Sequence, residues 1–213
     1  MKFRLIFEGA IPPRPRSSLA EIHHIRLKLA PQLEALWNFD PLAGEAKEWI
    51  RHPLENPGEY AILEQRGSSV FAPLISKRND LQCELDVTFL RQQASGQLIG
   101  DGGDIDNRVK TLLDALSVPP PAQADQFSDI GPSRLVYCLL QDDALVTKLA
   151  VETDRLLRPA ESKFDLVAIL QVVVRARRVT WGTIGLLGLE VRRDLARLGQ
   201  LDHVHRRRGS PNP

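Results

Sequence analysis

Apolar and polar residues alternate over several short stretches of this chain, which is the pattern of a β-strand with one buried face. Within Lys2–Glu8, the residues Phe3, Leu5 and Phe7 fall on one side. A longer stretch, Leu81–Leu90, alternates in the same way. Four further segments are apolar enough to be predicted as strands: residues 70–75, 135–140, 146–153 and 164–174.

Two segments have the spacing of a helix instead. Ser17 or Ser18, followed by Glu21, is typical of a helix start. We expect this helix to end near residue 29 or, if it continues past Pro31, near residue 37. A second helix is predicted over residues 107–116, where apolar residues recur every three or four positions. These apolar residues are Val109, Leu112, Leu113 and Leu116. Shorter helices are expected near residues 45–50 and 189–198.

The order of these elements predicts a mixed α/β fold, in which a β-sheet of five or six strands packs with two principal helices. The length of 213 residues suffices for one domain with its own hydrophobic core. We expect this domain over residues 1–175 and a basic, poorly ordered C-terminal extension over residues 176–213, where core-forming patterns are scarce.

Composition indicates an ordinary globular protein, with 43% hydrophobic and 26% charged residues. Cys83 and Cys138 lie within apolar runs, so we expect buried thiols rather than a disulfide. No signal peptide is evident, and the longest apolar run, Leu166–Val174, is too short to span a bilayer. These features predict a cytoplasmic protein without a membrane partner.

The formal net charge of +1 is low for a protein that binds a polyanion. Nucleic-acid binding would therefore require that positive charge is concentrated on one face. Basic residues do gather near the start of the chain, at Arg14, Arg16, Arg26 and Lys28, and again beyond Arg175. Two interpretations stay open: these residues contact phosphates, or they are solvated surface charges.

Candidate chemistry begins at the second helix. Asp104 and Asp106 stand at its start, and Lys110 follows Asp106 by one turn. Two carboxylates this close repel each other unless a cation lies between them, and Mg²⁺ prefers oxygen ligands. The structural alternative is that these acids only cap the helix and form a surface ion pair.

A second pair of acids, Asp142 and Asp143, follows directly after the apolar strand 135–140. If that strand lies beside the helix, one of these acids can complete a cluster of three carboxylates. Since successive strand residues face opposite ways, only one should point fully into such a site.

These residues together resemble the core of the RusA family of Holliday junction resolvases. The shared pattern is D-I-D-N-x-x-K-x-x-x-D-A-L, then an apolar strand, then D-D-A-x-V. The matching residues are Asp104, Asp106, Asn107, Lys110, Asp114, Ala115, Leu116, Asp142, Asp143, Ala144 and Val146. The resemblance spans most of residues 1–175, but its specific motifs lie within Asp104–Val146.

The resemblance implies a RusA-like fold and a Mg²⁺-dependent endodeoxyribonuclease, with Mn²⁺ as a possible substitute. Asp104, Asp106 and Asp143 would be the catalytic metal-binding carboxylates, with Asp142 as an additional ligand and Lys110 required for cleavage. The implied enzyme is a homodimer that resolves four-way DNA junctions by paired symmetric nicks. Our candidate DNA-binding residues are Lys110, Arg108, Arg14 and Arg16.

The chain departs from the family pattern in three places. Family members often have basic residues before the first acid, where this chain has Asp101, Gly102 and Gly103. The connection 118–134 is longer than usual, and residues 176–213 extend past the expected core. The alternative function is a non-catalytic branched-DNA-binding or scaffold protein with the same fold, although carboxylates that face phosphate would not help such a protein.

Overall fold

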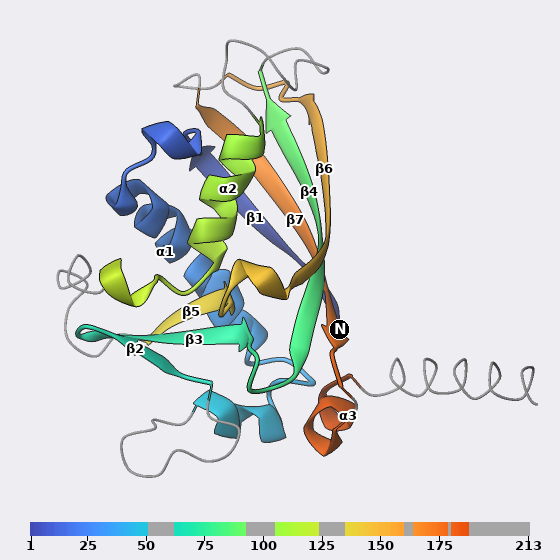
Figure 1. Ribbon diagram of the computed structural model, residues 1–213. Coiled ribbons are helices and arrows are strands. Elements are labelled where there is room, and N and C mark those ends of the chain that lie inside the picture. Colours follow the sequence, from blue (N-terminus) through green and yellow to red (C-terminus); the bar gives the residue numbers. More distant parts are fainter. Residues whose placement is uncertain (51–61, 93–104, 124–134, 160–163, 179, 188–213) are drawn as a thin grey trace, which may run out of the picture.

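Two β-sheets and two long helices make up the computed structural model (Figure 1). The structure describes residues 1–50, 62–92, 105–123, 135–159, 164–178 and 180–187. This arrangement confirms the predicted α/β class. It differs from the predicted count because the hairpin strand β2 (Glu64–Arg66) and the helix α3 (Trp181–Leu187) lie in segments without a clear period.

The larger sheet has four strands in the order β1-β7-β4-β6. Their bounds are β1 Lys2–Ala10, β7 Asp165–Ala176, β4 Leu81–Arg91 and β6 Val146–Arg155. β7 is antiparallel to both of its neighbours, whereas β6 runs parallel to β4. The inward residues of β4 are buried in strict alternation, as the sequence predicts.

The smaller sheet has the order β2-β3-β5, with β3 spanning Ser69–Ile75 and β5 spanning Leu135–Leu140. β2 and β3 form an antiparallel hairpin, and β5 runs parallel to β3. The carboxyl ends of β3 and β5 therefore lie at the same edge of this sheet. Three short 3-10 helices lie in the connections: η1 (Arg14–Arg16) between β1 and α1, η2 (Glu45–Ile50) after α1, and η4 (Asp143–Leu145) between β5 and β6.

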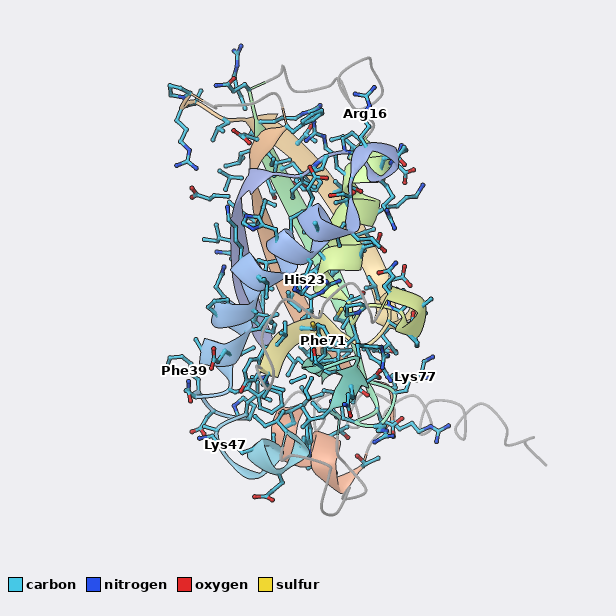
Figure 2. All side chains as sticks on the ribbon, turned by 90° about the vertical axis from the view of Figure 1, so that its left-hand side faces the viewer. Arg16, His23, Phe39, Lys47, Phe71 and Lys77 are labelled. Carbon is cyan, nitrogen blue, oxygen red and sulfur yellow. The ribbon has the colours of Figure 1, made fainter. Side chains whose placement is uncertain are left out.

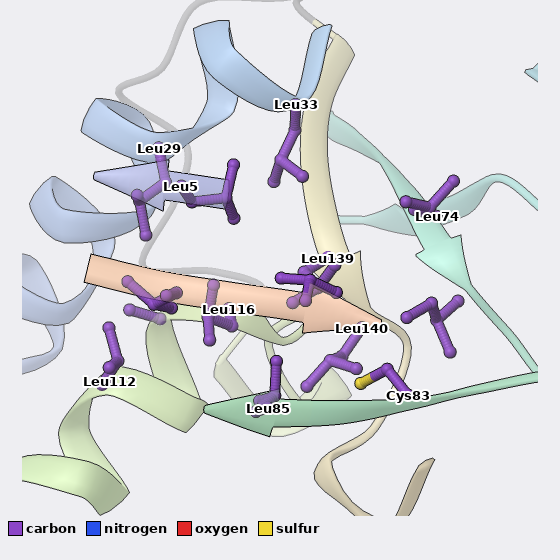
Figure 3. Close-up of a cluster of buried hydrophobic side chains, with 14 of the residues drawn as sticks. Leu5, Leu29, Leu33, Leu74, Cys83, Leu85, Leu112, Leu116, Leu139 and Leu140 are labelled. Atoms are coloured by element: carbon purple, nitrogen blue, oxygen red, sulfur yellow. The ribbon is translucent and has the colours of Figure 1, made fainter. Parts of the chain in front are cut away.

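The helices α1 (Leu19–Leu36) and α2 (Ile105–Leu116) pack on one face of the larger sheet (Figure 1). Their apolar sides meet the inward strand residues in one core, which Figure 3 shows in part. The labelled leucines there include Leu29 and Leu33 of α1 and Leu112 and Leu116 of α2. Burial of these side chains is the main force that holds the helices on the sheet.

Both cysteines, and the tryptophans Trp37 and Trp49, lie in the core. Cys83 and Cys138 are free thiols and fully buried, which confirms the prediction. Trp37 and Trp49 are also buried. In the part of the chain that the structure describes, no helix is long and apolar enough to cross a membrane.

The beginning of the predicted C-terminal extension packs on the body of the protein. The Arg177 amide donates to the carbonyl of Asp80 at 2.7 Å. In α3, Leu186 and Leu187 are buried within the main core. The helix predicted near residues 189–198 lies outside the described residues.

The start of α1 is fixed by a reciprocal pair of hydrogen bonds. The Glu21 amide donates to Ser18 Oγ at 3.2 Å, and the Ser18 amide donates to Glu21 Oε2 at 2.7 Å. This capping box satisfies two amides that the first helical turn would otherwise leave unpaired. The helix then continues past Pro31 to Leu36, close to the longer of the two predicted lengths.

We expect Ser18→Ala to lower the free energy of unfolding by about 1 kcal/mol, because the substitution removes the side-chain half of the cap. Urea unfolding followed by circular dichroism measures this change. Ser18→Thr, which keeps the hydroxyl, should retain most of the stability. Equal stability of Ser18→Ala and the native chain would contradict the assigned role of the cap.

Candidate functional site

One face of α2 carries charged side chains at intervals of four residues, as the sequence predicts. Lys110 Nζ lies 2.7 Å from Asp106 Oδ2, and both side chains are more than half exposed. One turn further, Asp114 Oδ2 lies 2.5 Å from Arg14 Nε of η1. Opposite signs therefore alternate along an exposed helix face, while the other side of α2 is buried in the core.

The C-terminal end of α2 is joined to the end of β5. The Val118 amide donates to the carbonyl of Leu140 at 3.0 Å. The Gln141 amide in turn donates to the carbonyl of Ile75, the last residue of β3, at 2.8 Å. These bonds place the residues after β5 beside the last turn of α2.

A cleft of about 340 Å³ opens at this junction. The residues that line it come from α2 and the segment after it, and from the ends of β2, β3 and β5. Its charged and amide side chains are Glu64, Arg66, Lys77, Asp114, Gln141, Asp142 and Asp143. Acidic side chains outnumber basic ones in this set, so a cation would find a favourable potential in the cleft.

The adjacent acids Asp142 and Asp143 have different environments. Asp142 Oδ1 accepts a hydrogen bond from the Ala144 amide at 2.9 Å and caps η4. Partial burial raises the pKa of Asp143, and hydrogen bonding to Asp142 together with the charges of Asp142 and Asp114 raises it further. A cation bound in the cleft would therefore reduce the electrostatic repulsion that acts on the charged form of Asp143.

The structure brings Asp142 and Asp143 to α2, but to its C-terminal end. Asp106 lies eight residues before Asp114, which is about 12 Å along a helix axis. Asp104 lies outside the described residues. Among the residues that the structure describes, no three His, Cys, Asp or Glu side chains are close enough to hold a metal ion together. The described carboxylates thus form two separate groups on one surface.

Arg108 needs a correction. We predicted that it contacts DNA, but its side chain is only 2% exposed. Its Nη1 donates to the carbonyls of Ile11 at 2.7 Å and Phe164 at 3.2 Å, and its guanidinium lies 5.6 Å from the centre of the Phe164 ring. Arg108 therefore fastens α2 to the chain segments after β1 and before β7.

Arg26 has a comparable role at the other end of α2. Its guanidinium is buried and donates to the carbonyls of Asp114 at 2.7 Å and Ser117 at 3.1 Å. A cation at the C-terminal end of a helix also complements the helix dipole. Arg26 is consequently one of the basic residues near the chain start that hold the fold rather than face solvent.

Arg14, Arg16 and Lys77 remain at the surface. Arg16 is exposed on η1, and Lys77 Nζ lies 3.9 Å from Asp142 Oδ2. Figure 2 shows Arg16 and Lys77 toward opposite ends of α2 along the side of the molecule where that helix lies. Lys77 was not predicted, although it follows β3, and the carboxyl ends of parallel strands meet at one edge.

Comparisons of the chain with protein-family models, with curated proteins and with solved structures found no match. The features of this chain that bear on its function are therefore the charged surface of α2, the adjoining cleft and the sequence motif that they carry.

We expect Arg108→Met to lower the free energy of unfolding by about 1–3 kcal/mol, because buried carbonyls lose their donor. Arg16→Met, at an exposed position, should change it by less than about 0.5 kcal/mol. Chemical denaturation of both variants measures the difference. An Arg108→Met chain as stable as the native one would mean that the buried hydrogen bonds contribute nothing.

The raised pKa of Asp143 predicts how a substitution at this residue changes thermal stability with pH. Above the folded-state pKa the charged carboxylate destabilises the fold, and below the ordinary pKa of aspartate, about 3.9, this cost is absent. Asp143→Asn should therefore raise the thermal midpoint at pH 7 in EDTA and give no such gain near pH 3. Glu34→Gln, at an exposed position on α1 outside the cleft, is the control. A lower midpoint for Asp143→Asn at pH 7 would refute the argument.

Proposed function

We propose that this protein is a Mg²⁺-dependent endonuclease that cuts branched DNA, with the four-way junction as its main substrate. The observation that carries the proposal is the exposed face of α2, where Asp106 and Lys110 lead to Asp114 and the acidic cleft. This surface contains the residues of the D-x-D, lysine and D-D pattern that the structure describes. It combines metal-ligand chemistry with basic groups suited to phosphate.

The donor set fits a hard divalent cation. Carboxylate oxygens are the side-chain ligands that Mg²⁺ prefers. A bound cation would also offset the repulsion between Asp143 and its acidic neighbours Asp142 and Asp114. We propose that Asp104 and Asp106 hold a metal ion at the start of α2, and that Asp143, with Asp142 as an additional ligand, holds one in the cleft at the other end of the helix. Mn²⁺ is proposed as a substitute for Mg²⁺. When bound, the cation supplies a water of lowered pKa and neutralises charge on the phosphate.

Lys110 is suited to the phosphate itself. Its ammonium group has three donors, and the pair with Asp106 leaves the side chain more than half exposed. A positive group held at this position stabilises negative charge that develops on the phosphate oxygens during cleavage. Arg14 and Arg16 lie on the adjoining η1, where they would contact flanking phosphates and make binding salt-dependent.

The experiment that tests the proposal is a nicking assay on a labelled synthetic four-way junction. Duplex, flap and single-stranded DNA are the controls, each with Mg²⁺ and with EDTA. Paired symmetric cuts in the junction that require Mg²⁺ would support the proposal, and two-fold symmetry of the cuts would agree with a dimer. Cleavage of every substrate would keep the nuclease and remove its junction specificity. Binding without cleavage of any substrate would favour a non-catalytic junction-binding protein.

Asp104→Asn should abolish cleavage while junction binding is retained or improved, because the substitution removes a metal ligand and a negative charge that repels phosphate. Gel-shift binding and the nicking assay on the same preparation measure both effects. Glu34→Gln, at an exposed position on α1 away from these residues, should behave as the native chain in both. Undiminished cleavage by Asp104→Asn would remove Asp104 from the proposed metal site.

A further inference from the structure

β6 forms one edge of the larger sheet and is ten residues long. It pairs with β4 on one side, and no described strand pairs with its other side, which faces outward in Figure 1. The strand contains neither proline nor glycine, and its pairing with β4 is regular from Lys148 onward. Leu149 on this strand is 42% exposed.

At the opposite edge of the same sheet, side chains of α1 form hydrogen bonds with the outward backbone groups of β1. The side-chain amide of Gln32 in α1 accepts from the Ile6 amide at 3.0 Å and donates to the Ile6 carbonyl at 2.7 Å. Lys28 donates to the carbonyl of Glu8 at 3.2 Å. α1 thus blocks β1 from pairing with another strand, as edge strands usually require. No described helix covers β6 in this way.

The direction of the backbone groups on β6 follows from its parallel pairing with β4. The Leu156 amide donates to the carbonyl of Arg91, whose partner in the register is Arg155. In a parallel ladder, every second residue of a strand bonds to the two residues that flank its partner, and Arg91 therefore bonds to residues 154 and 156. The even-numbered residues of β6 therefore bond to β4, and the odd-numbered residues direct their amides and carbonyls outward.

The sequence of β6 is complementary to itself about Ala150. In an antiparallel pair of two copies with Ala150 on the two-fold axis, Lys148 faces Glu152 of the second copy. Leu149 faces Val151, and Thr147 faces Thr153. Opposite charges, apolar pairs and threonine pairs are the cross-strand combinations that stabilise antiparallel sheets.

This register also matches the outward backbone groups. The odd-numbered residues of one copy, whose amides and carbonyls point outward, face odd-numbered residues of the other copy. Each Leu149 therefore exchanges two backbone hydrogen bonds with Val151 of the second copy. A two-fold axis at Leu149 would place Lys148 opposite Ala150 and lose the opposite-charge pair. An axis at Val151 would place Glu152 opposite Ala150 and Leu149 opposite a threonine. The axis at Ala150 alone satisfies charge, apolar contact and hydrogen bonding together.

We propose that β6 is the surface at which two copies of this chain pair, antiparallel and centred on Ala150. The two four-stranded sheets then join into one continuous sheet of eight strands. Pairing would bury Leu149 against Val151, which already packs partly on the core. The inference rests on the strand alone and holds whether or not the protein cleaves DNA.

Ala150→Cys tests the register directly. At the centre of the pair, the two Cα atoms of residue 150 are opposed without hydrogen bonds, at about 4.5 Å, which is within the range of a disulfide. Mild oxidation should convert this variant to a covalent dimer on a non-reducing gel. The native thiols do not interfere because Cys83 and Cys138 are buried.

Glu152→Cys is the matched control on the same strand face. In the proposed register its two copies are four residues apart along the strand, about 13 Å, so no disulfide should form. Equal cross-linking of both variants, or none with Ala150→Cys, would overturn the register. A native chain that sedimentation shows to be monomeric at micromolar concentration would overturn the dimer itself.

Charge reversal gives a second, independent measurement. In a dimer of Glu152→Lys, Lys148 of each copy faces the new lysine of the other copy. In a dimer of Lys148→Glu, Glu152 of each copy faces the new glutamate of the other copy. Each variant alone should raise the dimer dissociation constant roughly tenfold or more. An equimolar mixture should restore tight pairing, because the mixed dimer again has opposite charges at both contacts.

Glu34→Lys on α1 makes the same charge change at an exposed position away from the strand and should leave dimerisation unchanged. A mixture that pairs no better than its two components would refute the cross-strand contact. Neither measurement uses DNA, so the result is independent of the endonuclease assay.

Discussion

The position of α2 depends on two buried arginines that donate to backbone carbonyls. Arg108 binds the carbonyls of Ile11 and Phe164 near the helix start, and Arg26 binds those of Asp114 and Ser117 at its end. An unpaired buried guanidinium would be costly, and each of these is accommodated because several acceptors surround it. Beside Arg26, burial lowers the pKa of His23 to about 4, so a neutral ring accepts from that arginine.

This attachment determines which face of α2 is exposed. With its apolar side on the sheet and both ends fastened, the helix presents Asp106, Lys110 and Asp114 to solvent in a row. The hydrogen bond from Val118 to Leu140 then adds the acids after β5 to the end of that row. In the proposed endonuclease, this fixed row of charged groups would supply electrostatic stabilisation to the phosphate.

The two edges of the larger sheet show how the same constraint can be met in two ways. Unpaired backbone groups at a sheet edge invite another strand. At β1 the glutamine and lysine of α1 occupy those groups within the chain. At β6, Lys148 and Glu152 lie symmetrically about Ala150, so that in the proposed register each would face the opposite charge of a second copy. In the proposed dimer, the charged face of α2 would be repeated by the two-fold axis, as paired nicks on a symmetric junction would need.

Local sequence determined most of the secondary structure of this protein. The periods of two and of about 3.6 residues set the long strands and both main helices, because burial of one face favours one backbone geometry. The Ser18–Glu21 cap and the buried cysteines could be predicted for the same reason, since they depend on neighbours in the chain or on apolar context. The hairpin strand β2 and the helix α3 have no period of their own and were missed.

The candidate site shows where sequence alone was insufficient. The sequence by itself determined the motif residues and their spacing along α2, including the pair of Asp106 and Lys110 one turn apart. Only the tertiary structure decided that Asp142 and Asp143 meet the Asp114 end of the helix, and that Arg108 and Arg26 are buried. The physical reason is that an arginine or aspartate has the same local pattern whether it faces solvent or a carbonyl in the core. Which of these it faces depends on strands that are far away in the sequence and close together in the fold.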